Sequence, residues 1–95
     1  MRICRVDVNQ ATIVKALRKL GCTVTPTHMV NNGFPDLVVG FMGVNYLFEI
    51  KDGAQMPSKK ALTTDEKKWH SEWKGSVHIV YCLDDAIAIL QGKPR

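Results

Sequence analysis

The sequence predicts one α/β domain whose elements follow the order α-β-β-β-α-β-α. Ninety-five residues suffice for a single hydrophobic core and leave no room for a second domain, so residues 1–95 are taken as one unit. Apolar residues at helical spacing mark the first and last helices, and runs rich in β-branched and aromatic residues lie between them. The fourth strand follows a helix, so we expect it to enter the sheet by a crossover, parallel to a neighbour, in a central mixed four-stranded sheet flanked by helices.

The first helix is expected from Asn9 to Leu20. Gly21 follows the last apolar residue and is well placed as a C-terminal stop. Asp7 can cap the start, and Gln10, three residues later, would complete a capping box. One helical face carries the apolar residues Ile13, Val14, Leu17 and Leu20.

Three strands come next. Cys22–Thr25 predicts a short first strand, which Pro26 either limits or places at a sheet edge. Residues 37–48 form two apolar runs around Met42-Gly43, typical of a hairpin. A two-residue turn there would place Phe41 opposite Val44 and Asp36 opposite Glu49. Met-Gly is not a favoured pair for such a turn, so a longer loop stays open.

The second half of the chain supplies the remaining elements. Residues 52–61 lack periodicity and are expected to form an exposed, mobile loop. A helix over Thr64–Trp73 would start with a capping box formed by Thr63 and Glu66. Val77–Cys82 predicts the fourth strand, and a last helix, residues 84–90, would be capped by Asp84-Asp85.

Charge and cysteine content indicate the setting in which the chain works. A formal net charge of +4 and a pI near 9.1 favour polyanionic partners. The three cysteines are widely spaced and form no C-x-x-C, so we expect no disulfide framework and a reducing compartment. No apolar run reaches the ~20 residues that span a bilayer, and the first residues lack the apolar core of a signal peptide. A soluble, cytoplasmic protein without membrane contact is expected.

Three charged residues stand where the hairpin opens: Asp36, Glu49 and Lys51. Side chains alternate faces along a strand, so Glu49 and Lys51 point the same way, and the predicted register brings Asp36 to them. Such groups in an apolar setting are costly unless something binds them, and a divalent metal and a phosphate would suit them. The structural alternative is an internal ion pair at the end of the sheet.

These motifs resemble a known group of enzymes. Pro35-Asp36 and Glu49-Ile50-Lys51, on the second and third strands of an α-β-β-β-α-β core, are similar to the PD-(D/E)XK nuclease superfamily. Two longer patterns, Gly33-x-Pro35-Asp36 and Leu62-Thr63-x-x-Glu66-x-x-Trp69, resemble its virus-type replication-repair nuclease (VRR-NUC) branch, often found as small standalone phage proteins. The resemblance extends from about residue 7 to residue 90 and implies a restriction-endonuclease-like core.

The resemblance implies a metal-dependent DNA endonuclease that hydrolyses phosphodiester bonds. Asp36, Glu49 and the backbone carbonyl of Ile50 would hold Mg²⁺ or Mn²⁺, which prefer oxygen ligands. Lys51 would orient the attacking water or stabilise charge on the phosphate. Related nucleases often carry a glutamate on the first helix where this chain has Gln10. Gln10 is therefore either a weak metal ligand or only part of the capping box.

The resemblance also bears on partners. Standalone members are expected to act as homodimers on branched DNA, like Holliday-junction resolvases, and a phage-encoded copy would work in the host cytoplasm with replication or recombination proteins. The alternatives are a DNA-binding or assembly module of the same fold, or a nuclease subunit that needs a replication or packaging partner. The candidate phosphate contacts are Lys59, Lys60, Lys67 and Lys68, for which the alternative is a solvated face.

Aromatic residues of the second helix allow two interpretations. Trp69 and Trp73 are four residues apart and share one helical face. They could stack on nucleic-acid bases, but packing in the core is the favoured interpretation. His70 is expected at the surface or in an interface, without a catalytic role.

Overall fold

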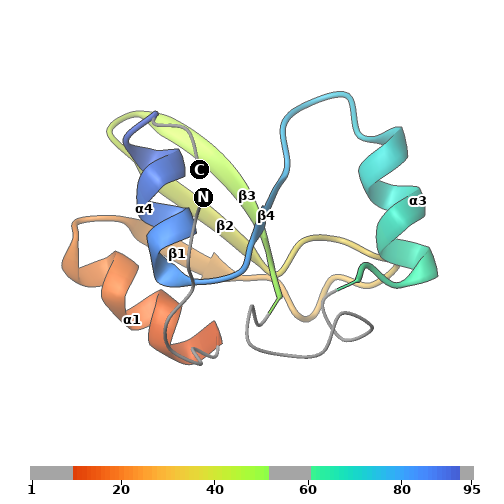
Figure 1. Cartoon of the computed structure of the whole chain (residues 1–95), viewed down its shortest axis with the longest axis horizontal. Coiled ribbons are helices and arrows are strands. Elements are labelled where there is room, and N and C mark those ends of the chain that lie inside the picture. Colours follow the sequence, from red (N-terminus) through yellow and green to blue (C-terminus); the bar gives the residue numbers. More distant parts are fainter. Residues whose placement is uncertain (1–9, 52–60, 93–95) are drawn as a thin grey trace.

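The computed structural model describes residues 10–51 and 61–92. Their four strands form one sheet in the order β1-β2-β3-β4, in which β1, β2 and β3 are antiparallel and β4 runs parallel to β3. This confirms the predicted α/β class, the mixed sheet and the crossover (Figure 1). The elements are α1 (Gln10–Lys19), β1 (Thr23–Pro26), β2 (Leu37–Phe41), β3 (Val44–Ile50), α3 (Thr64–Glu72), β4 (His78–Val80) and α4 (Leu83–Leu90). The proposed Asp7 cap and the loop at 52–60 lie outside the described residues.

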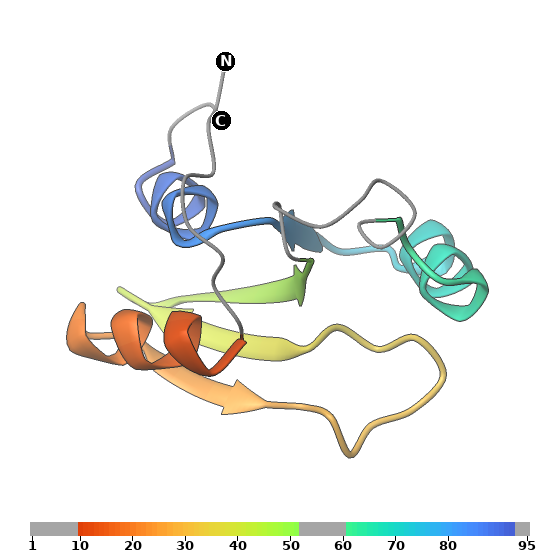
Figure 2. The same ribbon diagram turned by 60° about the horizontal axis from the view of Figure 1, so that its bottom comes forward.

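One face of the sheet carries the core. Alternation along the strands puts Leu37, Val39 and Phe48 on this face, all fully buried. Helix α1 contributes Ile13 and Leu17, and α4 also packs against the same cluster. Helix α3 has no buried residue and lies apart from α1 and α4, beyond the ends of the strands (Figures 1 and 2). Its position therefore depends on a few individual contacts.

The β2–β3 hairpin has the register that the sequence predicts. Phe41 pairs with Val44 across a two-residue turn, and Leu37 pairs with Phe48. Met42 and Gly43 have φ values of +49° and +81°, the left-handed conformation that a type I′ turn requires at both positions. Met42 is exposed, and methionine tolerates this left-handed conformation poorly. The register places Asp36, just before β2, next to Glu49.

The capping predictions had different outcomes. The capping box at α3 is confirmed, because the Thr63 hydroxyl accepts from the N–H of Glu66 at 3.2 Å and Glu66 accepts from the N–H of Thr63 at 2.8 Å. The expected caps of α4 are wrong, because Cys82 is the N-cap residue and makes no side-chain capping bond. Asp85 lies in the first turn, is buried, and reaches back to accept from the N–H of Tyr81 at 2.9 Å.

Two features bear on the expected compartment. Cys22 is a free, buried thiol, but Cys82 is disulfide-bonded, which differs from the expectation of reduced cysteines. None of the helices between residues 10 and 51 or 61 and 92 combines the length and apolarity needed to cross a membrane.

Candidate active site at the open end of the hairpin

Two carboxylates meet where β2 begins and β3 ends. The backbone N–H of Ile50 donates to Oδ2 of Asp36 at 2.7 Å, which holds the Asp36 side chain at the last residue of β3. Glu49, the residue before Ile50, is only 1% exposed and interacts directly with the Asp36 carboxyl. The structure thus brings together Asp36 and Glu49, as the hairpin register requires.

The environment of Glu49 strongly favours its protonated form. Burial, followed by the hydrogen bond and negative charge of Asp36 and the charge of Glu66, raises the pKa of Glu49 to about 10. Its Oε1 atom is buried and has no hydrogen-bond partner among the described residues. At neutral pH Glu49 therefore holds a proton, and a cation bound by this carboxyl would have to displace it.

Lys51 joins the pair from the same face of the chain. Its Nζ lies 4.0 Å from Oε2 of Glu49 and 2.8 Å from Oε1 of Glu66, so the closer partner is Glu66. Burial alone would raise the pKa of Glu66, but the hydrogen bonds from Lys51 and from the N–H of Thr63 lower it below its ordinary value. One oxygen of Glu66 thus serves both the helix cap and the lysine.

Sequence reasoning placed Glu66 in the capping box and in the family pattern but gave it no role in the site. A capping box fixes the carboxylate at the third helical position, and that constraint is visible in the sequence. The missing information was which strand the start of α3 would face. The contact between Lys51 and Glu66 supplies it.

His70 completes the cluster from the next turn of α3. Its Nε2 lies 3.9 Å from Oε1 of Glu49 and, like that oxygen, is buried without a hydrogen-bond partner in the described part of the chain. Burial, more than the opposing charges of Glu66 and Lys51, lowers the pKa of His70, so the ring is neutral at neutral pH. His70 was expected at the surface or in an interface, and the structure places its side chain, 13% exposed, between α3 and Glu49. The sequence feature that could have placed His70 near the site is its position four residues after Glu66, on the same face of the helix.

Close contacts with the loop before Asp36 hold α3 in place. Gly33 has φ +86°, and a Cβ there would lie 2.3 Å from the carbonyl oxygen of Asp65. Next to it, the ring of Phe34 meets Trp69 edge-on, with centroids 5.3 Å apart. Trp69 in turn stacks on Trp73 at 4.6 Å. Trp73 is 44% exposed and neither tryptophan belongs to the core cluster, so the core interpretation of this pair was wrong.

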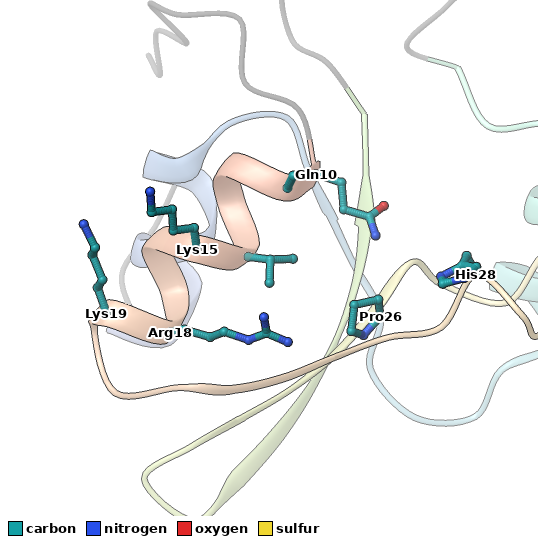
Figure 3. Close-up of a pocket in the computed structure, with 8 residues that line it drawn as sticks. Gln10, Lys15, Arg18, Lys19, Pro26 and His28 are labelled. Carbon is teal, nitrogen blue, oxygen red and sulfur yellow. The ribbon is translucent and has the colours of Figure 1, made fainter.

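The other predicted site residues lie away from this cluster or outside the described chain. Lys67 and Lys68 are exposed on α3. Lys59 and Lys60 are outside the described residues. Gln10 lines a groove along α1, together with Arg18 and other residues of that helix (Figure 3).

The carboxylate pair suits a hard divalent cation better than zinc. Within residues 10–51 and 61–92, no group of three or more His, Cys, Asp or Glu side chains is arranged to hold a metal ion. Mg²⁺, however, commonly binds through one or two carboxylates and keeps several waters. Asp36 and Glu49 supply two carboxylates, and the orphaned Oε1 of Glu49 is an oxygen that lacks a partner. The residues therefore fit Mg²⁺ or Mn²⁺.

Comparison of the chain with protein-family models, with curated proteins and with solved structures found no match.

Proposed function

We propose that this protein is a Mg²⁺- or Mn²⁺-dependent DNA endonuclease with a restriction-endonuclease-like fold, as its resemblance to the VRR-NUC branch implies. The observation that carries the proposal is the pair Asp36–Glu49, a half-buried and a buried carboxyl held against each other, with Lys51 beside them. Placing the buried Glu49 carboxyl against a second carboxyl costs stability unless something binds them, and a pKa raised in this way is frequent at functional sites. A reaction that requires a cation between two carboxylates and a positive charge beside them explains all three side chains.

Each residue has a distinct part in the proposed hydrolysis. Asp36 and Glu49, with the backbone carbonyl of Ile50, would hold the metal ion, which when bound polarises the phosphate and lowers the pKa of a water. Lys51 stabilises negative charge on the phosphate oxygens as it develops. Glu66 keeps the ammonium group of Lys51 beside the carboxylates, since the two are 2.8 Å apart.

The resemblance also leads us to propose branched DNA as the substrate and a homodimer as the active form. A 95-residue protomer offers little surface for two duplex arms. A symmetric pair would present two sites for two strands of a symmetric junction. The proposed setting is the cytoplasm, alongside replication or recombination proteins.

One observation favours a second candidate. The ammonium group of Lys51 is already paired with Glu66, and Glu49 is protonated at neutral pH, so the cluster is also consistent with an internal ion pair. In that case the domain binds DNA or assembles with a partner, and cuts weakly or only within a replication or packaging complex.

Cleavage of defined substrates tests the proposal. Purified protein is incubated with labelled four-way junction, flap, single-stranded and linear duplex DNA, in Mg²⁺, Mn²⁺ or chelator. We expect metal-dependent cutting that is fastest on the junction and strongly reduced in Lys51→Ala. The matched control is Lys74→Ala, at an exposed lysine after α3, which should cut at the wild-type rate. DNA binding without cutting in any metal would support the second candidate instead.

A further inference from the structure

A basic groove follows helix α1, away from the carboxylate cluster. It encloses about 790 Å³ and is bounded by α1 on one side and by Pro26 and His28, at and just after the end of β1, on the other. Figure 3 shows Arg18 reaching from the helix toward Pro26, while Lys15 and Lys19 rise from the outer rim. Of the residues predicted for the nuclease site only Gln10 lines this surface, and none of the predicted lysine contacts does.

The charged side chains that line this groove are all positive. Lys15, Arg18 and Lys19 lie at i, i+3 and i+4 and therefore neighbour one another on the helix surface. Helix α1 contains no acidic residue that would neutralise them. Among the described residues, the Arg18 guanidinium donates to the carbonyl of Val24 on β1 at 3.0 Å, and a guanidinium carries further donors that a ligand can use.

The groove also has apolar walls. Val14 and Pro26 contribute carbon surface between the cations, and the lining as a whole is more apolar than polar. A duplex presents mainly phosphates to such a groove, because its bases are stacked inside. A single strand presents phosphates together with unstacked sugars and bases, which suits cations placed around an apolar floor.

The groove begins at the same end of the sheet as the candidate active site. Thr27, which lies between Pro26 and His28, donates its backbone N–H to the carbonyl of Asp36 at 2.9 Å. A strand bound along α1 would therefore lead toward Asp36 at the strand ends. Pro26 pairs with Leu37, the residue after Asp36, so the groove ends beside the start of β2. Leu37 faces the core beneath α1, so Asp36 points to the opposite face, and a bound strand would pass around the end of the sheet to reach the carboxylates.

We propose that the α1 groove binds the backbone of single-stranded DNA and guides it to the Asp36–Glu49 site. The inference rests on the proposed function, because the bound strand is guided to the proposed nuclease site. It adds a binding surface that is separate from the catalytic residues. Binding can therefore be measured in chelator, without cleavage.

The test compares two charge reversals that change the net charge equally. Lys15→Glu lies in the groove and Lys74→Glu lies after α3, both at exposed lysines, and thermal melting verifies that both variants fold. Fluorescence anisotropy with a labelled mixed-sequence 20-mer, single-stranded or duplex, gives the affinity over a salt series in chelator. For the single strand we expect Lys15→Glu to bind about tenfold more weakly, with a salt slope lower by at least ~0.7, the value for one lost phosphate contact. Lys74→Glu should remain within twofold of wild type.

Three results would overturn the groove proposal. The first is an affinity of Lys15→Glu within twofold of wild type. The second is an equal loss of affinity in Lys15→Glu and Lys74→Glu, which would indicate diffuse attraction by net charge. The third is tighter binding of the duplex than of the single strand. Failure of the nuclease proposal looks different, because the protein would then bind the strand through Lys15 in chelator and cut no substrate when metal is added.

Discussion

The buried carboxyl of Glu49 should make the stability of the metal-free protein fall as pH rises from 7 to 9, and Glu49→Gln should remove this dependence. Burial and the neighbouring Asp36 raise the pKa of Glu49 from 4.5 to about 10, so the folded protein holds a proton that the unfolded chain has released. A raised native pKa gives stability that is complete below the unfolded pKa and is lost as pH rises toward the folded one. The window from 7 to 9 lies inside that range.

The magnitude follows from the linkage relation. Each pH unit in this window changes the free energy of unfolding by about 1.4 kcal/mol, so two units remove about 2.7 kcal/mol. For a domain of this size 1 kcal/mol corresponds to roughly 4–8 °C in Tm, which gives a fall of roughly 11–22 °C. His70 contributes little in this window, because its pKa is lowered from an ordinary value that is already below 7.

Thermal melting in chelator at pH 7, 8 and 9 measures the effect. Wild type is compared with Glu49→Gln and with Glu72→Gln, a matched change at an exposed position of α3. Taking the difference between variants cancels contributions from Cys22 and other shared groups. Parallel pH profiles for wild type and Glu49→Gln would refute the reasoning, whereas a flat profile in Glu49→Gln alone would support it. Mg²⁺ or Mn²⁺ added at pH 9 should also raise the Tm of wild type more than that of Glu49→Gln.

Three further changes test the surroundings of the site. Gly33→Ala should displace α3, because its Cβ would lie 2.3 Å from the carbonyl of Asp65, and should quench or shift tryptophan fluorescence and slow cleavage; an unchanged spectrum would contradict that packing. Met42→Asn should raise stability by ~0.5–1 kcal/mol, because Asn tolerates the left-handed conformation better, and a lower Tm would argue against strain at this turn. Glu66→Gln should reduce kcat severalfold with little change in DNA affinity, since it loosens Lys51, and an unaltered kcat would leave Glu66 only its capping role.

The hairpin and its carboxylates could be predicted because local rules determine them. Alternation along β2 and β3 and a two-residue turn are sufficient to set Asp36 beside Glu49, and the observed pairing of Phe41 with Val44 follows that register. Sequence preferences for two-residue turns, however, do not favour Met-Gly. The chain adopts it nonetheless, with Met42 in a left-handed conformation that sequence preference alone disfavours.

The position of α3 could not be predicted in this way. Hydrophobic periodicity shows which face of a helix is buried, and α3 buries none of its residues completely. Lys51, Glu49 and the loop at Gly33 hold it instead, through contacts between residues far apart in the sequence. Consequently Glu66 and His70 were missed as members of the cluster, and the two tryptophans were assigned to a core that they do not join.

The most direct test of the central claim is the rate at which Asp36→Asn cuts a labelled four-way junction in Mg²⁺. Asp84→Asn is the matched control, because Asp84 is exposed at the start of α4, away from the cluster. We expect Asp36→Asn to bind the junction with near wild-type affinity and to cut at least a hundredfold more slowly, while Asp84→Asn cuts normally and chelator stops every reaction. Cutting by Asp36→Asn at the wild-type rate would show that the carboxylate pair at the open end of the hairpin is not the catalytic centre.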